Sequence, residues 1–274
     1  MKAPLWRRAT LSVGMLALAL IIGVPLYYIV INTFKTQADM VASPLGLPTE
    51  WSFANWGQVL GNPSIYQSFG NTLYVTVLGV ALQVLIGAMA AYAMLITHSR
   101  FAKILAAVLL LGFMIPGQST LIPLYRTLVG LSLVDNLNGL VLMYLGGSIF
   151  CFFLIQGYMR TIPYEIIEAA RVDGAGTMQV FWRIVLPLIK PILITVSVFQ
   201  TMWVWNDFLL PTVFLSSPQK QTVVLQVYSA VSEFTTDWPA FMTVTVVALI
   251  PMVIFFIFTQ RHIVSGLLAG SVKG

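Results

Sequence analysis

The sequence is poor in charge, because Asp, Glu, Lys and Arg make up only 8% of its 274 residues. Its single cysteine, Cys151, has no partner for a disulfide, and His98 and His262 each stand alone, without zinc-site spacing. No G-x-x-x-x-G-K-[ST] phosphate loop, H-E-x-x-H or G-x-S-x-G motif occurs. We therefore assign no catalytic, metal or ATP site to this chain and interpret Cys151 as a packing residue.

Apolar residues make up 58% of the chain, far more than in soluble globular domains. They come in runs of about 20 or more, the length that spans hydrocarbon as a helix. We predict an all-α, polytopic membrane protein, folded as one domain (1–274) with six transmembrane helices. The predicted spans are residues 10–31, 71–97, 103–125, 139–158, 191–212 and 240–260.

The first span follows Lys2, Arg7 and Arg8 and so resembles the start of a signal peptide. Its apolar run is longer than a signal peptide requires, and no convincing cleavage site follows it. Tyr27 and Tyr28 stand at its end, where aromatic rings anchor helices at the membrane interface. We interpret the segment as a retained span.

Basic residues divide unequally between the two sides of the predicted bundle. One side has only Lys35, Arg126 and Lys220. The other has eleven: Lys2, Arg7, Arg8, Arg100, Lys103, Arg160, Arg171, Arg183, Lys190, Arg261 and Lys273. Because Lys and Arg accumulate on the cytoplasmic side, we expect both termini, the tail 261–274 and the loop 159–190 to be cytoplasmic. Topology thus explains the net charge of +5, and we expect no nucleic-acid partner.

A small-residue surface lies in the second predicted span, formed by Gly87, Ala88, Ala90 and Ala91. Small side chains let transmembrane helices approach closely, and the surface includes a four-residue spacing of this kind. We expect it to pack against another helix.

The loop 159–190 is longer than helix connections in bundles require. Pro163 suits a first helical turn and Gly174 a helix end, which predicts a short helix of about three turns. From Thr177, apolar residues recur at helical spacing until Pro187. The loop is therefore predicted to form a helix, a tight turn and a second helix.

The first of these helices has features of a docking surface. Ala169 and Ala170 allow a partner to approach closely, and Glu165, Glu168 and Arg171 supply exposed charges that fix register. An amphipathic hairpin with a purely structural role is the alternative interpretation.

Three groups of residues in this loop carry a family resemblance: Glu168-Ala169-Ala170, then Gly174 after three residues, then Ile184-x-Leu186-Pro187 after nine. They resemble the cytoplasmic EAA loop of permease subunits in bacterial ABC importers. The resemblance implies the type I ABC importer permease fold. It also implies that residues 165–176 sit in a cleft of a separate ATPase and transmit its closure to the membrane helices. The implied coupling residues are Glu165, Glu168, Ala169, Ala170, Asp173, Gly174 and Ala175.

Two further motifs resemble the carbohydrate importers of the maltose type. They are Trp205-Asn206-Asp207-Phe208 and a tail that runs from Gln260-Arg261 to Val272-Lys273-Gly274. Within that type the chain is similar to the second, shorter permease. The resemblance implies a second homologous permease, an ATPase dimer that binds ATP and Mg, an extracytoplasmic solute-binding protein, membrane lipid and a carbohydrate-like solute.

Two segments are candidates for the wall of a solute path. An aspartate at mid-span costs roughly 2.5–3.5 kcal/mol, so Asp207 either offers a solute hydrogen bonds or caps a helix break before Pro211. Pro116 and Pro123 weaken the third span, which either lines a cavity or is an ordinary kinked helix. The predicted path residues are Gln118, Ser119, Thr120, Trp203, Trp205, Asn206 and Asp207.

Other functions remain open at this stage. A polytopic enzyme acting on lipid-linked sugars would need a catalytic acid and base, but the acidic residues near the outer face are scattered. A secondary carrier would not explain the EAA loop. No span has Lys or Arg at its centre, which favours an uncharged solute. A polyol or a glycerol phosphodiester remains an alternative solute to a sugar.

Overall fold

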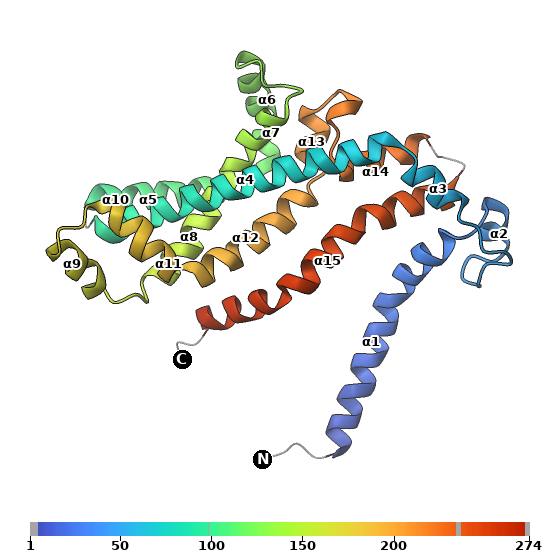
Figure 1. Cartoon of the computed structure of the whole chain (residues 1–274), viewed down its shortest axis with the longest axis horizontal. Coiled ribbons are helices and arrows are strands. Elements are labelled where there is room, and N and C mark those ends of the chain that lie inside the picture. The colour runs from blue at the N-terminus through green and yellow to red at the C-terminus, as the bar shows by residue number, and fades with distance from the viewer. Residues whose placement is uncertain (1–4, 98, 234–236, 272–274) are drawn as a thin grey trace. The chain divides into compact units, whose positions relative to one another are not determined.

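A computed structural model describes residues 5–97, 99–233 and 237–271, and the regular secondary structure within these ranges is helical (Figure 1). Lys2, His98 and residues 272–274 of the predicted tail lie outside the described residues. The chain divides into two compact units, residues 1–66 with 226–251 and residues 67–225 with 252–274.

The first unit contains α1 (Leu5–Asn32), α2 (Gln37–Ala42), α3 (Ala54–Leu60) and parts of three helices shared with the second unit. The ring of Phe34 lies 5.4 Å from both Trp51 and Phe53, and 5.8 Å from Trp56. Only 6% of the apolar window of α1 is buried within the chain. This apolar surface is available to lipid or to another membrane protein.

The shared helices are α4 (Pro63–Ile96), α14 (Val223–Glu233) and α15 (Trp238–Ser271). The remaining helices belong to the second unit: α5 (Arg100–Phe113), η1 (Gly117–Thr120), α6 (Leu121–Gly130), α7 (Leu137–Tyr144), η2 (Leu145–Gly147), α8 (Ser148–Met159), α9 (Glu165–Val172), α10 (Thr177–Val180), η3 (Phe181–Val185), α11 (Leu186–Leu188), α12 (Lys190–Trp205), α13 (Leu209–Phe214) and η4 (Pro218–Lys220).

The sequence sets the start of α4, one of the shared helices. The Asn62 side chain accepts a hydrogen bond from the backbone N–H of Ser64 at 3.0 Å, and Pro63 occupies the first helical position. An Asx side chain before a helix and a proline at its first position both favour helix initiation. The helix runs on to Ile96, so it begins before the predicted span 71–97.

The described residues contain between four and six candidate spans by length and apolar composition. Four helical segments qualify alone, and two bent helix pairs qualify if each counts as one span. The third predicted span, 103–125, is not one straight helix, because α5 ends at Phe113 and meets the segment 117–130 at 94°. Pro116, which lacks a backbone N–H, stands in this break. The fifth predicted span, 191–212, is also interrupted, because α12 ends at Trp205.

The small-residue surface of α4 packs against α8, as the sequence predicts. Ala88 and Ala91 are fully buried, in one cluster with the fully buried Cys151 of α8. At Gly87 the contact is so close that a Cβ would lie 2.5 Å from the Cβ of Cys151 and 2.9 Å from the backbone nitrogen of Phe152. Helix α4 therefore requires glycine at this point.

We predict that Gly87→Ala destabilises the protein by about 1–3 kcal/mol, because the added methyl forces α4 and α8 apart. A lower melting temperature in detergent would show this. Gly79→Ala on the same helix is the matched control, since its Cβ would lie 3.6 Å from the nearest atom of Tyr144, an ordinary contact. Equal melting temperatures for the two variants would contradict the prediction.

Candidate coupling hairpin and solute path

The segment 165–188 forms the helix, turn and helix that the sequence predicts; we call it the coupling hairpin. Figure 1 shows α9, α10 and α11 near the end of α4 where that helix finishes. The first helix, α9, has eight residues and so about two turns, shorter than the three predicted. The second helix, which we call the second limb, is continuous from Thr177 to Leu188. It includes a π-helical turn at Phe181–Val185, before Pro187.

A Schellman turn ends α9. Gly174 has φ of +85°, and its N–H donates to the Arg171 carbonyl at 3.0 Å. The N–H of Ala175 donates to the Ala170 carbonyl, also at 3.0 Å. Only glycine adopts such a φ without strain, and the two bonds satisfy carbonyls at the end of the helix. Gly174 therefore sets the direction of the second limb.

The two faces of α9 differ. Ile167 is fully buried and Ala170 nearly so, and both belong to the hydrophobic cluster shared with α4 and α8. The opposite face carries Val172, 86% exposed, beside exposed acidic residues. Of the predicted coupling residues, Glu165, Glu168, Ala169, Asp173 and Gly174 are exposed, Ala175 is half-buried and Ala170 packs inside the chain. Most of the predicted coupling residues are therefore accessible at the surface of the chain.

The predicted path residues at the end of α12 have mixed surroundings. Trp203 is 52% exposed and meets the ring of Tyr144 edge to face at 5.8 Å. Trp205 is buried, with its ring 6.4 Å from Phe69. Asn206 is exposed, and its side chain donates to the Met202 carbonyl at 2.7 Å. Trp203 thus offers the accessible aromatic face.

The carboxylate of Asp207 is bound within the chain. It accepts hydrogen bonds from the Tyr144 hydroxyl at 2.9 Å and from the Leu209 backbone N–H at 3.0 Å, just where α13 begins. These bonds support the interpretation of Asp207 as a cap at a helix break.

The other predicted path residues, Gln118, Ser119 and Thr120, form η1 between α5 and α6. The hydroxyls of Ser119 and Thr120 donate to carbonyls three residues back in the chain. Within the described ranges, no hydrogen bond or ring contact joins these residues to those at the end of α12. A cavity of about 240 Å³ lies elsewhere, at the ends of α4 and α8 and the start of α5. It is lined by Ala91, Met94, Leu95, Thr97, Lys103, Gln156, Met159 and Arg160, so none of the predicted path residues borders it.

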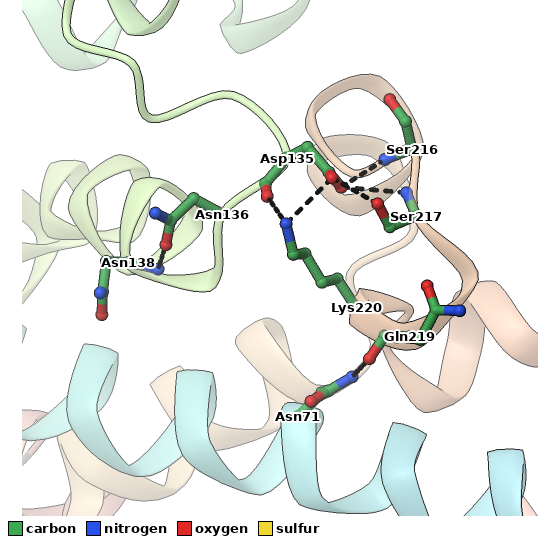
Figure 2. A network of polar contacts seen from close by, with 8 residues as sticks. All are labelled: Asn71, Asp135, Asn136, Asn138, Ser216, Ser217, Gln219 and Lys220. Carbon is green, nitrogen blue, oxygen red and sulfur yellow. Dashed lines mark hydrogen bonds and ion pairs between the residues drawn. The ribbon is translucent and has the colours of Figure 1, made fainter.

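A polar network joins the turn before α7 to the segment after α13 (Figure 2). The carboxylate of Asp135 accepts bonds from the backbone N–H groups of Ser216 and Ser217 at 2.9 and 3.0 Å, and also from the Ser217 hydroxyl. The Lys220 ammonium lies 3.0 Å from the same carboxylate. The hydrogen bonds from Ser217 lead the causes that hold the pKa of Asp135 well below its usual range.

The same network reaches α4. The side chain of Asn71 donates to the carbonyls of Gln219 and Gln221, both at 2.9 Å. Three segments far apart in sequence are thus fixed together by Asp135, Lys220 and Asn71. The carboxylate of Asp135 therefore has a structural role here.

Sequence reasoning missed three polar residues inside the helices. Tyr144 is fully buried and holds Asp207, and Tyr92 is 4% exposed and bonds to the coupling hairpin. Gln83 is fully buried, and its side-chain amide has no hydrogen-bond partner among the described residues. A hydrogen-bonding side chain within an apolar helix was the available signal in each case.

We predict that Asp135→Asn lowers stability by about 1–2 kcal/mol at neutral pH, because charge-assisted hydrogen bonds are lost. The folded pKa is lowered, so the contribution of Asp135 is complete above its ordinary pKa of about 4 and is lost as pH falls below it. The difference in melting temperature from the parent should therefore shrink on acidification. Glu50→Gln, at an exposed carboxylate, is the control; a difference that grows in acid would contradict the prediction.

The family model and the similar proteins described below all belong to membrane transport systems. Residues 83–268 match the family described as the inner membrane component of binding-protein-dependent transport systems. The chain is 34% identical over 250 residues, 91% of both proteins, to a probable starch degradation products transport system permease protein, AmyC, of Thermoanaerobacterium thermosulfurigenes. It is 30% identical to the melibiose/raffinose/stachyose import permease protein MelC of Bacillus subtilis (strain 168), over 92% of this chain and 91% of MelC.

The fold matches a solved structure of a bacterial ABC transporter that imports the acidic polysaccharide alginate. The match has a TM-score of 0.80 and 24% identity, and it covers 95% of this chain and 99% of the other. At 24% identity, this structural similarity shows the fold alone.

Proposed function

Because the chain belongs to the family of inner membrane components of binding-protein-dependent transport systems, we propose that it is a permease subunit of an ATP-driven sugar importer. Its relatives AmyC and MelC are named for starch degradation products and for melibiose, raffinose and stachyose. The observation that carries the proposal is the coupling hairpin, which lies inside the region that matches the family. A membrane enzyme has no comparable support.

The proposed complex contains several partners. A second homologous permease completes the pathway, an ATPase dimer binds ATP and Mg, and an extracytoplasmic binding protein delivers the solute. Helix α1 exposes most of its apolar residues, and α5 has no buried residue. Both helices supply surfaces for lipid or for the second permease. The unequal distribution of Lys and Arg supports cytoplasmic termini and a cytoplasmic coupling hairpin.

Energy coupling would take place at the exposed face of α9. Its acidic residues and Val172 would enter a cleft of the ATPase, while Ile167 and Ala170 hold the helix on the membrane bundle. A movement of the ATPase would thereby reach the buried cluster. The chain itself would hydrolyse nothing.

The proposed solute is an uncharged sugar. The exposed face of Trp203 could stack on a sugar ring, and Asn206 offers an amide beside it. A polyol would use the same groups, and uptake measurements distinguish these solutes.

We predict that Gly174→Val abolishes uptake while insertion into the membrane persists, because a β-branched residue at φ of +85° forces the turn to change. Gly157→Ala is the control, since Gly157 lies in α8 outside the hairpin and a Cβ added there would have no atom within 4 Å. Uptake of radiolabelled raffinose and maltotriose into cells measures transport, and the amount of the chain in isolated membranes measures insertion. Normal uptake by Gly174→Val would argue against a coupling role for the hairpin.

A crosslinking experiment tests the ATPase contact. In native membrane vesicles, a thiol-reactive crosslinker at Ala169→Cys, an exposed position, should capture a protein that photolabels with azido-ATP. A cysteine at Leu105, exposed on α5, is the control and should not capture it. If Ala169→Cys captured no ATP-binding protein in vesicles that accumulate sugar, the proposed function would fail.

A further inference from the structure

Tyr92 forms a direct contact between the membrane helix α4 and the coupling hairpin. Its side chain is 4% exposed, and its hydroxyl donates a hydrogen bond to the carbonyl of Thr177 at 3.1 Å. Its ring lies 5.4 Å from the ring of Phe181, at an interplanar angle of 35°. A buried tyrosine hydroxyl requires a hydrogen-bond partner, and here the hairpin supplies it.

The two contacts of Tyr92 fall on one short part of the hairpin. Thr177 is the first residue of α10, directly after the turn that Gly174 begins. Phe181 is 1% exposed and is the first residue of the π-helical turn η3. Tyr92 therefore holds the second limb where it leaves the turn.

On the membrane side, the end of α4 that carries Tyr92 is fixed. Gly87 is five residues away, about 7.5 Å along the helix, and there α4 touches the backbone of α8. Ala88 and Ala91 are fully buried in the same cluster. A force that reaches Tyr92 therefore acts on a helix end that is tightly packed against its neighbours.

The covalent route from the hairpin into the membrane is less direct. After α10 the chain passes through the π-helical turn and then bends by 77° between the segment 177–188 and α12. Because of this bend, a displacement along the second limb is not directed along the axis of α12. The Tyr92 contact reaches α4 without such a bend.

From this geometry we propose that Tyr92 is a positioning residue that makes the hairpin and α4 move as one body when the ATPase acts. The proposal rests on the proposed function, because it requires the hairpin to be driven by an ATPase. The role proposed for Tyr92 makes α4, and not α12 alone, a helix to which the hairpin transmits the movement of the ATPase.

The test uses the whole complex, purified with its ATPase and reconstituted in lipid nanodiscs. Spin labels are placed at Gln179→Cys on α10 and Val77→Cys on α4, both exposed positions. Val77 lies fifteen residues from Tyr92, about 22 Å along the helix, which gives a separation suited to pulsed electron paramagnetic resonance. Distances are measured without nucleotide and after trapping with ADP and vanadate.

With Tyr92 present, we expect one narrow distance distribution in both states. In Tyr92→Phe, which keeps the ring but loses the hydroxyl, the share of molecules at a second distance should rise roughly fivefold in the trapped state. Phe181→Leu, which removes the ring contact from the hairpin side, should have the same effect. Tyr158→Phe on α8 is the control, because Tyr158 also packs against the buried cluster but its hydroxyl has no hydrogen bond among the described residues.

The outcomes separate this proposal from the proposed function. If no ATPase co-purifies with the parent chain, or if Ala169→Cys does not crosslink to it, the proposed function fails before Tyr92 is varied. If the ATPase binds and crosslinks, but Tyr92→Phe and Phe181→Leu keep the narrow distribution of the parent in both states, only the role of Tyr92 is overturned. Broadening in Tyr158→Phe as well would also overturn it, because the effect would not be specific to this contact.

Discussion

The close packing of α4 against its neighbours is the constraint on which the second unit depends. Gly87 lets the backbones of α4 and α8 meet, and the same buried cluster takes in Ile167 of α9 and Phe181 of the second hairpin limb. Helices in lipid gain little from the hydrophobic effect against one another, so they depend on such close contact. The cluster fixes the coupling hairpin to the bundle and leaves the outer face of α9 exposed.

Polar side chains stabilise the places where the helices break. Asp207 accepts a hydrogen bond from the Tyr144 hydroxyl where α12 ends, and Asp135 fixes the turn before α7 to the segment after α13. Each broken helix leaves backbone groups without helical partners, and nearby side chains satisfy some of them. Both acidic residues therefore belong to the structural framework, although the sequence alone also allowed a functional reading of Asp207.

The proposed function requires a firmly packed interior and an accessible contact with the ATPase. The coupling hairpin has both features, because one face of α9 is part of the buried cluster and the opposite face is exposed. The turn at Gly174 and the hydroxyl of Tyr92 fix the direction of the second limb. Under the proposed function, movement at the exposed face of α9 would reach the membrane helices through these packed side chains.

The sequence by itself determined the all-helical membrane character, the hairpin and its glycine turn, because apolar run length and turn residues act locally. Only the tertiary structure decided that Ala170 faces inward while Ala169 stays exposed, that the segment 103–125 bends by 94°, and that Asp207 binds Tyr144. It also brought Tyr92 to Thr177, 85 residues later in the chain. Such contacts depend on how distant helices pack, which the local pattern of residues does not specify.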